Sequence, residues 1–282
     1  MKIRELFLAI FISLNFVHAQ DRGYLVIIGG GDRTEEIMGA ILRLSGVNQS
    51  VLIIPNASSE PERTGERLKE EFERLGYKDV KIFFGGREKA NDKEYIGQFE
   101  NCKVVFFSGG DQNLHTRDLL STELLRMIKK IYNEGGVISG TSAGAAVMSK
   151  IMITGNELIN KDSLNSFNSI ERGNIETSEG FGFLEDIIID QHYIKRKRLN
   201  RLISLVLENK DKLGIGIDES TAIIVNPGRT FEVIGESQVI VFDAKKSRVK
   251  ISPNNKLSGV NITTHVLVKG NKFDLKGRRV LK

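Results

Sequence analysis

The pentapeptide Gly-Thr-Ser-Ala-Gly at residues 140–144 places a serine, Ser142, where an apolar run gives way to small residues. A serine between an expected strand and an expected helix has the form of a nucleophile elbow, a sharp turn that presents the hydroxyl for attack on a carbonyl. The backbone N–H of Ala143, with that of Gly110 at a neighbouring strand end, would stabilise the oxyanion, helped by the helix N-terminus. Ser142 could instead be an ordinary N-cap of that helix.

A serine nucleophile needs a base, and three histidines follow residue 20. His192 comes directly after the apolar run and its polar end at 187–190, where the carboxyl end of a buried strand is expected. His115 fits the start of an exposed helix, and His265 lies in the strand-like C-terminal part of the chain. We therefore expect His192 to be the base.

The carboxylate that orients the histidine is expected at another strand end, in Gly-Ile-Asp-Glu at 216–219. Asp218 shares a face of this strand with Gly216, whereas Glu219 follows where the strand ends and can turn toward a histidine. Either residue could equally serve a turn or a helix cap. The spacing alone leaves the choice between the two carboxylates open.

Several other kinds of site are not predicted. The glycines at 29–31 lack the spacing of a dinucleotide fingerprint, and no segment matches a phosphate-binding loop. No His, Cys, Asp and Glu side chains have metal-site spacing, so neither a metal nor a cofactor is expected. The 41 basic and 36 acidic residues give a net charge of +5, too small and scattered to predict nucleic-acid binding but suited to an acidic substrate.

Alternating apolar strands and helices are expected to position these residues. Short apolar runs bounded by glycine, proline or polar residues predict strands at 24–28, 51–54, 80–84, 104–107 and 136–139. Helical periodicity and small residues predict helices around 37–44, 63–75, 119–132 and 143–148. This pattern indicates an α/β fold whose mostly parallel sheet is covered by helices on both faces, with ligands beyond the carboxyl ends of its strands. Further short strands predict a C-terminal antiparallel extension of the same sheet, at 222–225, 231–234 and 239–242.

The first nineteen residues have the order of a secretory signal peptide. Lys2 and Arg4 precede an apolar run at 6–17, and cleavage is expected after Ala19. The alternative is a buried N-terminal helix. The rest of the chain, 20–282, is expected to form one hydrolase domain that is exported to the periplasm or beyond. Its single cysteine, Cys102, has no partner for an intrachain disulfide, and no stable membrane anchor is expected.

Three ordered motifs together resemble a known family. They are Gly-Thr-Ser-Ala-Gly-Ala from 140, Asp-Gln-His-Tyr from 190 with three following arginines, and Gly-Ile-Asp-Glu-Ser-Thr-Ala from 216. They are similar to those of cyanophycinase, a family of serine exopeptidases related to aspartyl dipeptidase (peptidase E) with a class I glutamine amidotransferase-like fold. The resemblance implies a Ser142–His192–Glu219 triad, and so favours Glu219 over Asp218. It also implies a set of residues around the substrate: Gln112, Asp190, Gln191, Arg196, Arg198 and Arg201.

Helical spacing gives these arginines some independent support. In the segment 195–208, apolar residues share one helix face at Leu199, Leu202, Ile203 and Val206. Arg198 and Arg201 are expected to lie off that face, where guanidinium groups could hold carboxylates in forked geometry. A plain solvated basic face would look the same. Asn200 stands where the family pattern commonly has glycine.

The implied substrate is cyanophycin, a polyaspartate chain with arginine on each side-chain carboxyl, cleaved to β-aspartyl-arginine dipeptides through an acyl-enzyme. Two alternatives stay open: a dipeptidase acting on short aspartyl or isoaspartyl peptides, and a non-catalytic binding protein using the same cleft. An amidotransferase-like role would need a cysteine at the elbow, and Cys102 is elsewhere. The oligomeric state, including a homodimer, is also open, as is the role of the polar stretch 156–178 as a loop over the cleft.

Overall fold

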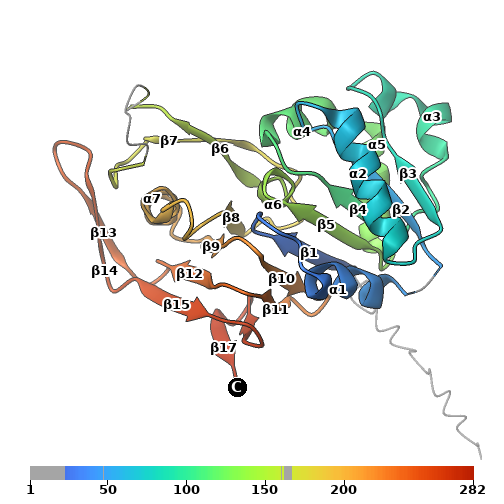
Figure 1. Ribbon diagram of the computed structural model, residues 1–282. Helices are drawn as coiled ribbons and strands as arrows, with labels where there is room; N and C mark the ends of the chain where they lie inside the picture. Colours follow the sequence, from blue (N-terminus) through green and yellow to red (C-terminus); the bar gives the residue numbers. More distant parts are fainter. Residues whose placement is uncertain (1–22, 47, 160, 162–166) are drawn as a thin grey trace, which may run out of the picture.

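The computed structural model describes residues 23–282 except 47, 160 and 162–166, so the predicted signal peptide lies outside the described residues. A large central sheet runs through the molecule in the strand order β17-β16-β11-β10-β1-β5-β4-β2-β3 (Figure 1). Its strands are β1 (Tyr24–Ile28), β2 (Ser50–Ile54), β3 (Asp79–Ile82), β4 (Val104–Phe107), β5 (Val137–Thr141), β10 (Thr221–Val225), β11 (Thr230–Gly235), β16 (Lys272–Asp274) and β17 (Arg279–Leu281).

The sheet has a parallel part and an antiparallel part that meet at β1. From β3 to β1 every neighbouring pair is parallel, whereas β1 pairs antiparallel with β10 and the pairs beyond it are also antiparallel. Parallel strands need crossover connections, and helices between these strands provide them. The predicted mixed α/β class, with a large sheet and an antiparallel extension through β10 and β11, is thus present.

Helices cover both faces of the parallel part. One face carries α1 (Glu35–Ser45) and α2 (Pro61–Arg74), and the other carries α3 (Lys93–Gly97), α4 (Gln112–Leu119), α5 (Glu123–Asn133) and α6 (Ala143–Ala146) (Figure 1). A single 3₁₀ turn, η1 (Lys89–Asn91), precedes α3. The expected helix at 119–132 begins later, because Thr122 caps α5 by accepting a hydrogen bond from the Leu125 N–H.

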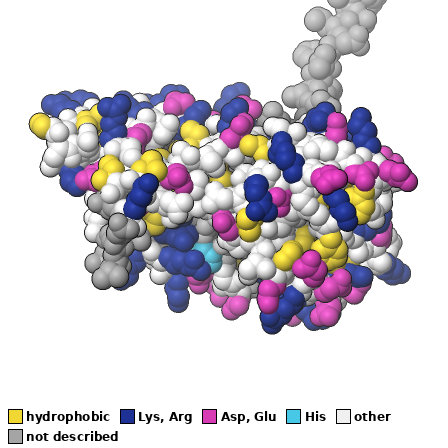
Figure 2. Space-filling model, turned by 90° about the horizontal axis from the view of Figure 1, so that it is seen from above, with side chains coloured by type: hydrophobic (Ala, Val, Ile, Leu, Met, Phe, Trp, Pro, Cys, Tyr) yellow, Lys and Arg dark blue, Asp and Glu magenta, His cyan; other side chains and the backbone are white. Residues whose placement is uncertain are grey.

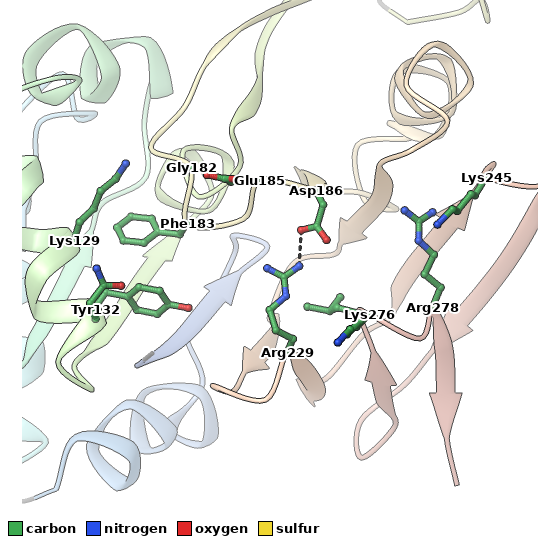
Figure 3. A pocket seen from close by; sticks show the side chains of 12 residues that line it. Lys129, Tyr132, Gly182, Phe183, Glu185, Asp186, Arg229, Lys245, Lys276 and Arg278 are labelled. Atoms are coloured by element: carbon green, nitrogen blue, oxygen red, sulfur yellow. Dashed lines mark hydrogen bonds and ion pairs between the residues drawn. The ribbon is translucent and has the colours of Figure 1, made fainter. Parts of the chain in front are cut away.

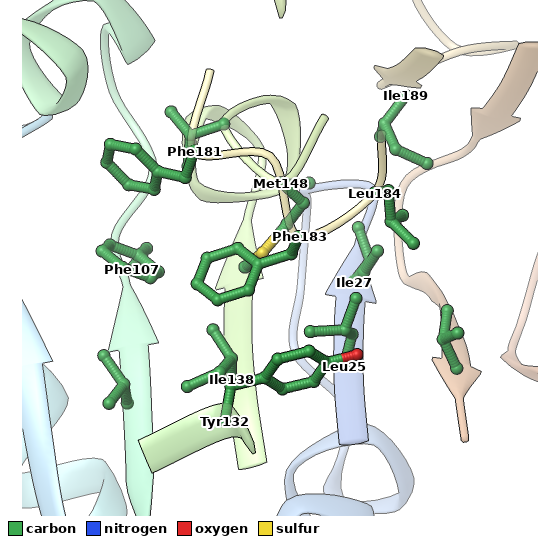
Figure 4. Close-up of a cluster of buried hydrophobic side chains, with 14 of the residues drawn as sticks. Leu25, Ile27, Phe107, Tyr132, Ile138, Met148, Phe181, Phe183, Leu184 and Ile189 are labelled. Carbon is green, nitrogen blue, oxygen red and sulfur yellow. The ribbon is translucent and has the colours of Figure 1, made fainter. Parts of the chain in front are cut away.

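Strand β1 shows why both faces are apolar. Val26 and Ile28 point into the cluster under α1 and α2, whereas Leu25 and Ile27 point into the cluster on the opposite side, and all four are fully buried. Figure 4 shows this second cluster, in which Leu25 and Ile27 lie among aromatic and aliphatic side chains from several elements. Since a parallel strand buries both faces, its sequence is continuously apolar instead of alternating.

A second sheet, in the order β15-β12-β9-β8, packs beside the first. Its strands are β8 (Ile187–Gln191), β9 (Leu213–Ile217), β12 (Val239–Asp243) and β15 (Thr263–Leu267). The expectation that 239–242 extends the central sheet is therefore wrong, because β12 pairs antiparallel with β9. One face of this sheet joins the core that contains Leu25 and Ile27, and the other packs against α7 (Leu199–Glu208).

Two hairpins complete the described chain. The polar stretch whose role was left open includes the end of β6 (Ile151–Glu157) and most of β7 (Ile175–Glu179), which pair antiparallel with an irregularity between Ile153 and Glu157. The other hairpin is β13 (Arg248–Ile251) with β14 (Leu257–Val260). The first hairpin lies beside α6 and β8, so it stands near the carboxyl ends of the strands that carry the predicted site.

Candidate active site

The three residues predicted as a triad meet at the carboxyl ends of β5, β8 and β9. Ser142 follows β5, His192 follows β8 and Glu219 lies two residues beyond β9. The Ser142 Oγ lies 2.8 Å from the His192 Nε2, and the His192 Nδ1 lies 2.6 Å from the Glu219 Oε1. Because a carboxylate only accepts, the Nδ1 must carry the proton, which leaves the Nε2 free to accept from the serine hydroxyl.

The backbone at Ser142 is strained in the way that an elbow requires. Its φ is 54° and its ψ is −107°, and its hydroxyl makes no capping hydrogen bond to α6. The structure therefore disfavours the alternative that Ser142 only caps a helix. A Cβ on Gly140 would come within 2.4 Å of the Gly144 carbonyl oxygen, so the turn needs glycine there. The helix α6 has only four residues, so the electrostatic effect expected from a helix N-terminus is small. Stabilisation of an oxyanion would have to come from individual N–H groups.

Glycines at the end of β1 make room for the other two residues. A Cβ on Gly30 would lie 2.3 Å from the His192 Cε1, and a Cβ on Gly31 would lie 2.8 Å from the Glu219 Cβ. The Gly29 carbonyl also accepts a hydrogen bond from the His192 N–H at 2.7 Å. The glycine spacing excluded a nucleotide motif but did not indicate this role beside the histidine. The position of these glycines at a strand end next to the predicted site was the signal that could have identified it.

The two candidate carboxylates have different partners. Asp218 is buried, and its Oδ1 accepts from the N–H groups of Ile194 and Lys195 at 3.0 and 2.8 Å. Its Oδ2 accepts from the Ser237 hydroxyl at 2.7 Å. Asp218 therefore holds the turn after His192, while Glu219 alone reaches the imidazole.

The surroundings of His192 favour its neutral form. The side chain is only 8 % exposed, and burial is the main cause that lowers its pKa below the ordinary 6.5. The Arg196 and Arg198 guanidinium groups lower that pKa further, and the hydrogen bond to Glu219 opposes them. A neutral imidazole at neutral pH can accept the serine proton, which is what a general base must do.

The remaining histidines and the cysteine lie in different environments. His115 is fully buried, burial lowers its pKa to about 4, and its Nε2 lies 3.1 Å from the Ser108 carbonyl oxygen. His265 lies on β15 and packs against the Phe273 ring. Cys102 is buried, and burial raises the pKa of its thiol to about 11, so the thiolate needed for cysteine chemistry is scarce.

The predicted oxyanion donors, Gly110 and Ala143, belong to two segments that reach Ser142. Gly110 follows Gly109, and a Cβ on Gly109 would be 3.4 Å from the Ser142 Cβ. Gly110 has a φ of 135°, and a Cβ there would strike the Ala57 carbonyl oxygen at 1.9 Å, so only glycine fits. Ala143 is the first residue of α6, directly after Ser142.

Of the predicted basic residues, Arg201 is turned inward. Its side chain is 2 % exposed, forms a forked ion pair with the buried Asp190 carboxylate and lies over the Phe167 ring. The expectation that Arg201 lies off the buried face of its helix is therefore wrong, and Leu199 is 44 % exposed instead of buried. An apolar pattern alone could not show this, because the nearby carboxylate is what allows a guanidinium to be buried.

The other predicted substrate residues are either held by hydrogen bonds within the protein or exposed to solvent. The Arg198 Nη1 donates to the Gln191 carbonyl oxygen and side-chain Oε1, and burial lowers the pKa of Arg198 to about 10, so it stays cationic. The Gln112 amide donates to the carbonyl oxygens of Ile153 and Thr154 on β6. Arg196 is 54 % exposed at its side chain, and its Nε lies 3.8 Å from the Glu219 Oε1.

The Asn200 amide, where the family pattern commonly has glycine, donates to the Phe167 carbonyl oxygen at 2.9 Å. Asn200 therefore ties the first turn of α7 to the segment before β7.

A pocket of about 300 Å³ opens at Ser142 and His192. Strand-end backbone forms part of its wall, and two arginines that sequence reasoning missed, Arg33 and Arg67, also line it. Figure 2 shows a face of the molecule on which a histidine side chain reaches the surface beside clustered basic side chains.

A larger hollow of about 680 Å³ lies at the opposite edge of the sheets, near the starts of β5 and β8 (Figure 3). There the Arg229 guanidinium is bonded to Asp186, and Lys129 and Tyr132 come from α5. No serine, cysteine or histidine lines this hollow among the residues described. The candidate nucleophile and base therefore belong to the smaller pocket.

No group of three or more His, Cys, Asp and Glu side chains among the described residues could hold a metal ion. Within the same residues, no helix has the length and apolar character needed to cross a membrane.

Comparison with known proteins places the chain in a family. The model of peptidase family S51 matches residues 25–233. The chain belongs to peptidase family S51. It is accordingly a serine peptidase, as the three motifs predicted. Cyanophycinase of Nostoc sp. is 33 % identical over 279 residues, covering 96 % of this chain and 91 % of the relative. Cyanophycinase of Thermosynechococcus vestitus is 32 % identical over 273 residues, covering 93 % and 82 %.

Solved structures of a peptidase and of a putative peptidase share the fold. A peptidase from an acI-B1 Actinobacterium superposes with a TM-score of 0.67 at 24 % identity, covering 90 % of this chain and 98 % of that one. A putative peptidase E protein from Listeria monocytogenes has a TM-score of 0.51 at 17 % identity, covering 77 % and 100 %. These likenesses support the arrangement of the mixed α/β fold around a central sheet.

Proposed function

We propose that this S51 peptidase hydrolyses the polyaspartate backbone of cyanophycin and releases β-aspartyl-arginine dipeptides. The observation that carries the proposal is the continuous series of hydrogen bonds from Ser142 through His192 to Glu219, in a chain related to cyanophycinases over nearly its whole length. The series supplies a nucleophile, a base and an orienting carboxylate in the order that acyl transfer needs.

The reaction would proceed in two halves. The Ser142 Oγ attacks the backbone carbonyl while the His192 Nε2 takes its proton, and the N–H groups of Ala143 and Gly110 stabilise the oxyanion. The protonated imidazole then gives that proton to the leaving amine, and the C–N bond breaks to leave an ester on Ser142. Water attacks the ester with His192 again as base, which releases the new carboxylate and restores the serine.

The basic residues beyond His192 suit a substrate with free carboxylates. Arg196 and Arg198 stand beside the imidazole, and we assign them to substrate binding together with Gln191, which Arg198 holds. Asp190, Arg201 and Gln112 already have internal partners, so we assign them to positioning the loop and the β6–β7 hairpin around the substrate.

The shape of the site favours a polymer over a dipeptide alone. The pocket at Ser142 shares Ser58 with a neighbouring hollow of about 610 Å³ that runs toward Lys89 and Arg117. A substrate of several repeats could extend into this space, whereas a single dipeptide would leave it unused. The alternative of a dipeptidase on short aspartyl peptides uses the same triad and differs only in this region. The proposal also includes export of the protein, predicted from residues 1–19, and a class I glutamine amidotransferase-like fold.

The test is incubation of the protein with cyanophycin and identification of the products by mass. We expect β-aspartyl-arginine from the wild-type protein, and a loss of at least about 10³-fold in rate for Ser142→Ala. Ser121→Ala, in the turn between α4 and α5, serves as the control because this residue is exposed and outside the site. Cleavage by Ser142→Ala at the control rate would refute the triad, and cleavage of aspartyl dipeptides with intact polymer would favour the dipeptidase.

A further inference from the structure

The wall of the Ser142 pocket formed by α2 and the segment before α1 is basic. Arg33 and Arg67 line the pocket there, and no aspartate or glutamate is among its described lining residues. These arginines lie on other elements than Arg196 and Arg198, which come from the segment between β8 and α7. Neither was part of any motif in the sequence.

The two arginines differ in how their charge is balanced. The Arg33 guanidinium forms a forked ion pair with Glu71 of α2, with 13 % and 18 % of the two side chains exposed. Arg67 lies one turn before Glu71 on the same helix and is exposed. Among the described residues, Arg67 forms no ion pair with a carboxylate, whereas Glu71 is paired with Arg33. Arg67 is therefore an unpaired cation on the rim of the pocket.

Arg67 lies on one particular side of the nucleophile, Ser142. The helix α2 packs on β2 and β3, whereas α7 packs on β8 and β9, and β5 with Ser142 stands between them (Figure 1). A peptide bound with its carbonyl at Ser142 runs past the serine in two directions. Arg67 therefore faces the part of the substrate that lies away from Arg196 and Arg198.

We propose that Arg67 is a specificity-determining residue that binds a carboxylate of the substrate, on the side of the scissile bond away from Arg196 and Arg198. The choice of substrate rests on the proposed function. A polyaspartate chain with arginine on each repeat carries a free carboxylate on every unit, so a carboxylate is available on both sides of the cleaved bond. A planar guanidinium matches such a group in forked geometry.

The test uses Ser142→Ala protein, so that binding is measured without cleavage. Two ligands are compared by calorimetry: a synthetic oligomer of three β-aspartyl-arginine units, and the same oligomer with its arginine carboxyl groups converted to amides. We expect Arg67→Gln to weaken binding of the carboxylate oligomer by about tenfold and to leave binding of the amide oligomer unchanged. Arg67→Lys, which keeps the charge but loses the fork, should recover part of the lost affinity.

Arg63→Gln is the matched control. Arg63 lies one turn away on α2, has a side chain that is 81 % exposed, pairs with Glu60 and does not line the pocket. It changes the net charge by the same amount, so its affinities for both oligomers should match those of the parent. The proposal is overturned if Arg67→Gln behaves as Arg63→Gln, if it weakens both oligomers equally, or if the parent protein binds neither.

The same oligomer separates this proposal from the proposed function. Carboxylate-dependent binding through Arg67, without cleavage by protein that retains Ser142, would refute the reaction and support the binding role. Cleavage with no dependence on Arg67 for either oligomer would support the reaction and refute the binding role.

Discussion

Replacing Gly30 by alanine should disable the site without removing any group that takes part in the chemistry. The new Cβ would lie 2.3 Å from the His192 Cε1 and 2.5 Å from the His192 Nε2. Carbon atoms in contact stay about 3.5 Å apart, so the imidazole must retreat by about 1 Å. The displaced Nε2 is the atom that lies 2.8 Å from the Ser142 Oγ.

The expected loss follows from that displacement. A misplacement of about 1 Å costs roughly 100-fold in rate, and complete loss of the serine–histidine contact costs up to about 10⁴-fold. The assay is the second-order rate at which a fluorophosphonate labels Ser142, since this reports activation of the hydroxyl without any choice of peptide. Thermal unfolding of the same protein shows whether the fold is retained.

Gly76→Ala separates the steric effect from the backbone effect. Gly76 has a φ of 100° against 106° for Gly30, but a Cβ there would meet no atom within 4 Å. Both variants should lose about 1–3 kcal/mol of stability because alanine disfavours this backbone region. Only Gly30→Ala should lose labelling. If the two variants label Ser142 at the same rate, the reasoning that this glycine makes room for the imidazole is refuted.

Two further predictions concern charge. Because the pKa of His192 lies below 6.5, the imidazole should remain a base down to about pH 6.5, and kcat/KM should fall only in more acidic solution. Arg196→Gln removes a cation that lowers this pKa, so the acid limb of the pH profile should move to higher pH. An unmoved profile would contradict the effect of Arg196 on the pKa of His192. Arg201→Met leaves the buried Asp190 carboxylate without its partner and should lower the free energy of unfolding, measured in urea, by about 3–5 kcal/mol. Adding Asp190→Asn to the same chain should restore part of that free energy. A decrease below about 1 kcal/mol for Arg201→Met would show that the fold does not need the ion pair.

The strand ends that carry the site were predictable because they combine a short apolar run with an abrupt polar corner. Ser142 follows such a run, and His192 and Glu219 follow two more. Local pattern also predicted the helices on both faces. It failed at β12, since a continuous apolar run specifies a strand without specifying its partner, and β12 pairs with β9 instead of the central sheet.

The choice between Asp218 and Glu219 shows another limit of local reasoning. The spacing placed both at the right edge, and only the family resemblance favoured Glu219. In the structure, backbone N–H groups after His192 and the Ser237 hydroxyl occupy Asp218, so the neighbouring carboxylate is the one left for the imidazole. Those partners lie in two other segments of the chain, and residue spacing in the sequence cannot show that they meet at Asp218.

Local sequence pattern identified the kinds of chemical group present and the strand ends on which they stand, because hydrophobic periodicity and glycine-rich corners act over a few residues. Which of these groups meet depends on how the whole chain folds. Folding buries Arg201 against Asp190, leaves Arg67 at the pocket without an ion-pair partner among the described residues, and sets Gly30 against the His192 ring. Each of these outcomes depends on a partner that is distant along the chain, and the energy of a charge or a close contact is set by that partner.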